Sequence, residues 1–60
     1  MQSLKLQFRD ITSMSLLYKT ESTLLPFVGN IVMIEKDQFL IEKVIISFDK
    51  QVALCYGKIL

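Results

Sequence analysis

The side chains that could carry chemistry in this 60-residue chain are few and lie far apart in the sequence. There is no histidine, and no nucleophile motif surrounds any of the five serines, so the usual base of nucleophilic catalysis is missing. Glu35 and Glu42 flank a predicted hairpin, where they form either an acid–base pair or two solvated strand-edge charges. Sixty residues also leave little volume for a substrate pocket. We predict no catalytic residues, no enzyme activity and no small-molecule substrate.

The single cysteine, Cys55, lies in an alternating apolar run between the small residues Ala53 and Gly57. This setting predicts a buried structural thiol rather than a reactive one. One cysteine without histidine cannot hold zinc, and the six carboxylates do not form the spaced loop that calcium prefers, so we predict no metal and no cofactor. A free cysteine and the absence of an export signal in residues 1–5 predict a cytoplasmic protein. The longest uncharged stretch, residues 22–34, is too short to span a bilayer, so no membrane partner is expected.

The charges are balanced, with seven basic and six acidic residues and a net charge of +1. Duplex binding through counterion release needs a concentrated basic patch, which the sequence lacks. A small β-barrel can still bind single strands by stacking bases on aromatic rings beside basic side chains. The residues that would serve this alternative function are Lys5, Arg9, Tyr18, Lys43, Tyr56 and Lys58. The competing interpretation assigns the phenylalanines to the core: Phe8, Phe39 and Phe48.

The first half of the chain contains one clear strand signal and one ambiguous segment. Apolar and polar residues alternate over residues 3–9, which is typical of a half-buried strand. Residues 14–19 also alternate and predict a second strand, although residues 11–18 carry apolar residues at helical spacing behind Asp10, a capping residue. Strand and short helix both remain open for residues 11–18. The polar residues 19–23 predict a loop.

The last thirty-five residues predict three more strands. Polar turns at Lys36–Asp37 and Asp49–Lys50 separate three apolar runs, and the alternation in the middle run changes phase at Glu42–Lys43. Such a change of phase is typical of a β-bulge or a sharp bend. The sequence therefore predicts one all-β domain over residues 1–60, a small five-stranded antiparallel meander closed into an SH3-like or OB-like barrel.

Several short motifs in this region resemble those of a known group of proteins. They are Leu25-Pro26-Phe27-Val28-Gly29-Asn30-Ile31-Val32, then Glu42-Lys43-Val44-Ile45, and then Phe48-Asp49. The chain resembles small SH3-like barrel proteins of bacteriophages and bacterial prophages, many of uncharacterised function, over about its C-terminal sixty per cent. Asn30 stands where the pattern of those proteins usually has Asp. The resemblance implies a small barrel and a viral or bacterial setting, so the cytoplasm would be that of a bacterial host. It assigns no functional residue.

The predicted outer face of the sheet is unusually apolar. An antiparallel sheet with one solvated face should alternate apolar and polar residues, and four outward positions break this rule. These positions are Ile31, Met33, Leu40 and Ile45. Exposed apolar patches mark protein interfaces, so we predict a homo-oligomer, or a module that binds another protein, through these residues. The alternatives are burial of both sheet faces within the barrel, or a strand register that differs from the predicted one.

Overall fold

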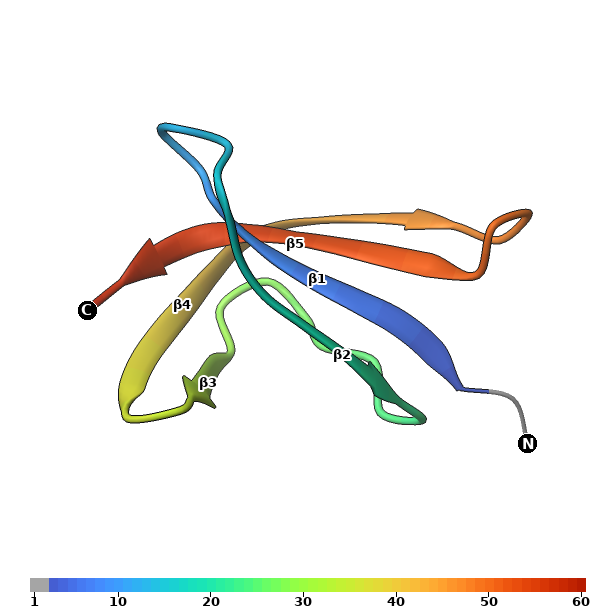
Figure 1. Cartoon of the computed structure of the whole chain (residues 1–60), viewed down its shortest axis with the longest axis horizontal. Coiled ribbons are helices and arrows are strands. Elements are labelled where there is room, and N and C mark those ends of the chain that lie inside the picture. The colour runs from blue at the N-terminus through green and yellow to red at the C-terminus, as the bar shows by residue number, and fades with distance from the viewer. Residues whose placement is uncertain (1–2) are drawn as a thin grey trace.

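The computed structural model describes residues 3–60, which form a single curled sheet (Figure 1). Every regular element in this part of the chain is a strand, so the all-β prediction is confirmed. No helix among these residues is long and apolar enough to cross a membrane. The five strands are β1 (Leu4–Asp10), β2 (Leu16–Ser22), β3 (Ile31–Ile34), β4 (Asp37–Ser47) and β5 (Val52–Ile59).

The strand order in the sheet is β2-β1-β5-β4-β3. Three neighbouring pairs are antiparallel, but β1 and β5 run parallel, with Phe8 opposite Cys55 in the register. The predicted antiparallel meander is therefore wrong, because β2 and β3 do not pair and the sheet is mixed. This parallel contact joins the β1–β2 hairpin to the three-stranded antiparallel unit β3–β4–β5 and leaves β2 and β3 as the sheet edges.

The predicted change of phase in the long strand is a β-bulge. The register between β4 and β5 shifts between Ile41 and Lys43, so Glu42 is the extra residue. Figure 1 shows β4 bending along its length, with its first part turning toward β3. The buried core residues of β4, Phe39 and Ile41, precede the bulge, and Val44 and Ile46 after it are partly buried and pack against the core. The core on the concave face consists of Leu6, Phe8, Ile34, Phe39, Ile41, Ala53 and Cys55.

Phe8 is at the centre of this core. Its ring lies 5.6 Å from that of Phe39 in an edge-to-face arrangement, and 6.3 Å from that of Tyr18, its cross-strand partner in β2. Aromatic pairs at these separations add to the stabilisation that comes from burial alone. The predictions that Phe8 and Phe39 belong to the core are confirmed. Phe48 was predicted with them, but it lies in the β4–β5 loop and is 82% exposed.

Residues 11–18 do not form a helix. A turn at residues 11–13 follows β1, and β2 then begins at Leu16. The predicted loop at residues 19–23 is wrong, because β2 continues to Ser22, and Tyr18 to Ser22 pair with β1 without interruption. The polar residues that suggested a loop belong to an edge strand, where charged outward side chains are common. Lys5 and Glu21, which are opposite in charge, face one another across this pair.

The predicted turns are close to their observed positions. The β3–β4 turn is Glu35–Lys36 rather than Lys36–Asp37, and Glu35 takes the positive φ of 55° that tight hairpin turns demand. The β4–β5 loop covers residues 48–51 and includes the predicted Asp49–Lys50. Strand β3 begins at Ile31.

Candidate protein-interaction surface

The outer face of the β3–β4 hairpin carries three of the four predicted interface residues. Ile31 and Leu40 are cross-strand partners, so their side chains lie on the same face of the sheet. Met33 follows Ile31 at the next outward position of β3. Ile31 and Met33 are 56% and 64% exposed, whereas Leu40 is half-buried. The hairpin thus places exposed apolar side chains along the outermost strand of the sheet.

The fourth predicted residue, Ile45, belongs to a different part of the surface. It follows the bulge, pairs with Leu54 of β5, and is separated from Leu40 by roughly 15 Å of strand. A small hollow of about 210 Å³ lies here, lined by Ile11, Met14, Lys43, Ile45 and Tyr56. The structure therefore does not gather the four predicted residues into one patch.

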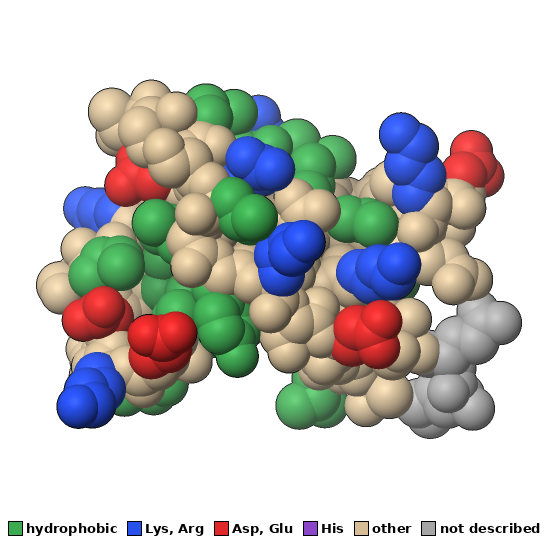
Figure 2. All heavy atoms as spheres, in the orientation of Figure 1, with side chains coloured by type: hydrophobic (Ala, Val, Ile, Leu, Met, Phe, Trp, Pro, Cys, Tyr) green, Lys and Arg blue, Asp and Glu red, His purple; other side chains and the backbone are tan. Residues whose placement is uncertain are grey.

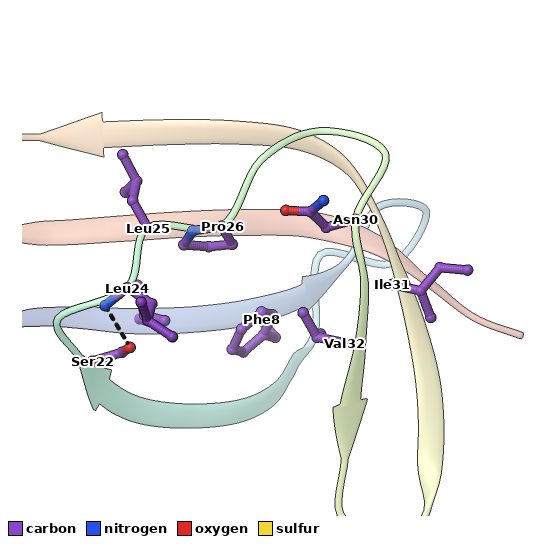
Figure 3. Close-up of a pocket in the computed structure, with 9 residues that line it drawn as sticks. Phe8, Ser22, Leu24, Leu25, Pro26, Asn30, Ile31 and Val32 are labelled. Atoms are coloured by element: carbon purple, nitrogen blue, oxygen red, sulfur yellow. Dashed lines mark hydrogen bonds between the residues drawn. The ribbon is translucent and has the colours of Figure 1, made fainter.

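A larger apolar cavity lies at the side of the sheet that β2 and β3 leave open (Figure 3). Its volume is about 460 Å³, and its apolar lining comes mainly from β1, β3 and the β2–β3 connection. Figure 3 shows Val32 directed toward Phe8, while Ile31 points to the other side of β3. The lining residues are Leu6, Phe8, Ser22, Leu24, Leu25, Pro26, Asn30, Ile31 and Val32. We call this space the seam cavity.

The β2–β3 connection next to the seam cavity was not predicted as part of a site. Leu24 is 79% exposed although it lines the cavity, and Phe27 and Val28 are also exposed. The sequence signal was present, because Leu24 to Val28 is almost entirely apolar in a segment that forms no strand. Exposed apolar residues in an irregular connection indicate a surface that favours contact with another molecule.

A tight loop at Phe27–Asn30 fixes the start of β3. The Asn30 side-chain oxygen accepts a hydrogen bond from the Phe27 amide at 2.8 Å, and the Asn30 amide donates to the Phe27 carbonyl at 3.1 Å. Gly29 has a φ of 93°, which favours glycine, and its amide donates to the Ile41 carbonyl. The Ile41 amide in turn donates to the Asn30 carbonyl at 3.0 Å. This loop attaches β3 to β4 and leaves the opposite edge of β3 without a strand neighbour.

The basic and aromatic residues of the alternative nucleic-acid site are only partly brought together. Arg9, Tyr56 and Lys43 form one row across β1, β5 and β4 on the outer face. Lys5 and Lys58 lie further along the same face, and Figure 2 shows lysine and arginine side chains in a loose row over β1 and β2. Tyr18, however, packs inward against Phe8.

The aromatic rings of that row offer little stacking surface. Tyr56 is only 9% exposed, and Tyr18 is half-buried. The Arg9 guanidinium is also engaged within the chain, since it donates to the Met14 carbonyl at 2.9 Å and to the Gln7 side-chain oxygen at 3.2 Å. Base stacking needs an accessible ring face, which neither tyrosine presents in this structure.

The groups considered for chemistry do not form a reactive constellation among residues 3–60. Cys55 is fully buried, as predicted, and burial raises the pKa of its thiol to about 11, so the thiolate is strongly disfavoured. Glu35 lies in the β3–β4 turn and Glu42 in the bulge at the other end of the hairpin, so the two are not brought together. No group of three or more metal-ligating side chains occurs within the described residues.

Comparisons with known proteins assign this chain to no family. No family model matches it, and no curated protein and no solved structure matches it significantly. The surface must therefore be interpreted from its own geometry.

Proposed function

We propose that this chain is a non-catalytic protein-binding module that associates with a second copy of itself. The observation that carries the proposal is the row of exposed apolar side chains on the outermost strand, Ile31 and Met33, next to an apolar cavity. Large apolar side chains gathered at an open side of a sheet favour burial against another protein. We propose that the chain is a small barrel of the SH3-like or OB-like kind, which the resemblance to SH3-like proteins of bacteriophages and prophages supports, and that its setting is the cytoplasm of a bacterial host.

The surface area of the molecule supports self-association. Its accessible surface is 4387 Å², whereas a folded monomer of 6.9 kDa is expected to expose about 4,000 Å². A sheet that is open at one side leaves this additional surface in water. A small dimer contact, at the low end of the range for protein interfaces, would cover the difference.

The proposal is tested by the solution mass, measured by light scattering over a dilution series at low and high salt. We expect a dimer at high concentration that dissociates on dilution, with little dependence on salt, because the proposed interface is apolar. A monomer at every concentration up to the solubility limit would contradict self-association. The double variant Ile31→Glu, Met33→Glu should be a monomer, because both exposed apolar residues of β3 become charged. An unchanged oligomer would show that this surface is not used.

Binding of single-stranded nucleic acid is the second candidate function, and the row of Arg9, Tyr56 and Lys43 is the observation in its favour. Phosphate contacts release counterions, so this function predicts affinity that falls steeply with salt. Fluorescence anisotropy with a labelled single-stranded oligonucleotide measures it directly. We expect no binding at physiological salt, because the tyrosine rings are covered.

A further inference from the structure

We propose that the second copy binds by edge-to-edge strand pairing, with β3 of one chain antiparallel to β3 of the other across a two-fold axis at Val32. This inference rests on the proposed self-association and specifies its geometry. The two free edges of the sheet are β2 and β3, and they differ in how they are protected. The choice between them follows from their side chains and from the direction of their backbone groups.

The β2 edge carries charges, while the β3 edge carries none. Lys19 and Glu21 occupy β2, and charged residues on an edge strand disfavour pairing with another chain. Strand β3 reads Ile31-Val32-Met33-Ile34, with no lysine, proline or bulge in it. An uncharged apolar edge is a template for an added strand. The β3 edge is therefore the docking edge.

The backbone groups of two β3 residues face the open edge. The Ile41 amide bonds to the Asn30 carbonyl, so Asn30 directs its carbonyl toward β4. In an antiparallel pair alternate residues face the partner strand, so Val32 and Ile34 also face β4. Ile31 and Met33 then turn their N–H and C=O groups away from β4, where no strand of this chain receives them.

A second copy of β3 satisfies these groups in one register. With the two-fold axis at Val32, Ile31 of one chain lies opposite Met33 of the other, and each pair exchanges both backbone hydrogen bonds. The same arrangement packs the exposed side chains of Ile31 and Met33 as cross-strand partners. A shift that pairs Ile31 with itself would place Met33 opposite Gly29, and the reverse shift would place Ile31 opposite Glu35. The Val32 register is the one in which both outward residues find an apolar partner.

The inner side of the pairing covers the seam cavity. Val32 points toward Phe8 (Figure 3), so Val32 of the second copy would lie beside it at the cavity mouth. A two-fold contact uses the same patch on both copies, and here each copy supplies both the edge and the cavity. Because β3 has only four residues, the contact is small, and we expect a dimer that dissociates on dilution.

The first test places a charge on the edge. Met33 is exposed, so Met33→Lys should leave the monomer folded, and circular dichroism checks this. We expect the dimer dissociation constant to rise on the order of 100-fold, because two cross-strand contacts are lost and two lysines must be desolvated. Phe48→Lys is the matched control, since it changes the most exposed apolar residue to the same charge away from the edge. It should dimerise as the wild type does.

The second test fixes the register. Val32→Cys places two thiols on the two-fold axis in a non-hydrogen-bonded pair, whose Cα separation of about 4.5 Å suits a disulfide. Mild oxidation should give a covalent dimer, whereas Met33→Cys, which faces Ile31, should cross-link at least about tenfold more slowly. The buried Cys55 is common to both variants and stays unreactive.

The possible results distinguish a failure of the β3–β3 pairing from a failure of self-association. If the wild type dimerises but Met33→Lys dimerises equally well, or the two cysteine variants cross-link at the same rate, the β3 pairing is overturned while self-association stands. A wild type that remains a monomer overturns both.

Discussion

At the scale of single residues, Gly57 is the position with the least freedom. It lies inside β5 opposite Ile41. A Cβ atom at Gly57 would overlap the carbonyl oxygen of Leu40, which belongs to the backbone and cannot move aside cheaply. The close approach of the β4 backbone at Leu40 therefore requires glycine at this position of β5.

Gly57→Ala should destabilise the fold by about 3 kcal/mol or more, because a backbone clash lies at the upper end of overpacking costs. Gly29→Ala is the matched comparison. Gly29 has open space around its Cα but a φ of 93°, so alanine there should cost only about 1–2 kcal/mol of backbone strain. Urea denaturation of both variants measures the difference. Equal losses, or a larger loss at Gly29, would contradict the proposed role of Gly57.

Cys55 should be inert in the folded protein. A thiol pKa raised to about 11 lowers the thiolate fraction at pH 8 by about 100-fold relative to an ordinary cysteine, and burial slows access further. We expect a thiol reagent to label Cys55 rapidly in denaturant and at least about 100-fold more slowly in buffer. Rapid labelling of the native protein at pH 8 would mean that this part of the core is open to solvent.

At the scale of elements, the turn after β1 depends on one carboxylate. The Asp10 side chain accepts hydrogen bonds from the amides of Thr12 and Ser13 at 2.8 and 3.0 Å. These bonds, first that from Ser13, hold the pKa of Asp10 below its usual value of 3.8. The hydrogen bonds to the ionised carboxylate stabilise the turn above about pH 4. This stabilisation is lost as the pH falls through the lowered pKa of Asp10 and the carboxylate is protonated.

Asp10→Ala should therefore speed amide exchange at Thr12 and Ser13 while leaving the strands protected. In the wild type, the local protection measured by NMR should be constant above about pH 4 and should decline below it, after correction for intrinsic exchange rates. Asp10→Asn is the control, because its side-chain oxygen still accepts these bonds but does not titrate. A decline of the same size in Asp10→Asn would show that another group controls the turn.

The elements show which structural features can be predicted from local sequence. Alternation predicted β1 and β4, and the change of phase predicted the bulge, because both features follow from which side chains face the core. The parallel pairing of β1 with β5 could not be predicted, since it joins segments more than forty residues apart and leaves no local signal. The end of β2 was missed because an edge strand uses the same polar residues as a loop.

The candidate site was also predictable only in part, because it depends on contacts between segments that are far apart in the sequence. Ile31 and Met33 stood out as apolar residues at outward positions, and the structure places them at an edge. Their position at an edge, and the separation of Ile45 from them, depend on the strand order and on the bend in β4. The seam cavity depends on the absence of a β2–β3 pair, which no local pattern indicates.

At the scale of the whole molecule, the sheet is a half-barrel that one chain leaves open. The β1–β5 contact joins the β1–β2 hairpin to the antiparallel strands β3–β4–β5, and nothing in residues 3–60 pairs with the outer edges of β2 and β3. The seam cavity and the exposed residues Ile31 and Met33 lie where the barrel fails to close. A second copy that adds its strand at β3 would extend the sheet and cover this surface, which links the open architecture to the proposed function.

The most direct test of this account is the amide exchange of Ile31 and Met33, measured by NMR as a function of protein concentration. In a monomer these two amides face solvent, so they should exchange quickly, whereas pairing with a second copy would bond them to its carbonyl groups. We predict that their protection rises with concentration while that of the β2 edge, residues 16–22, does not change. Exchange at Ile31 and Met33 that is independent of concentration, from dilute to concentrated solution, would contradict pairing through β3.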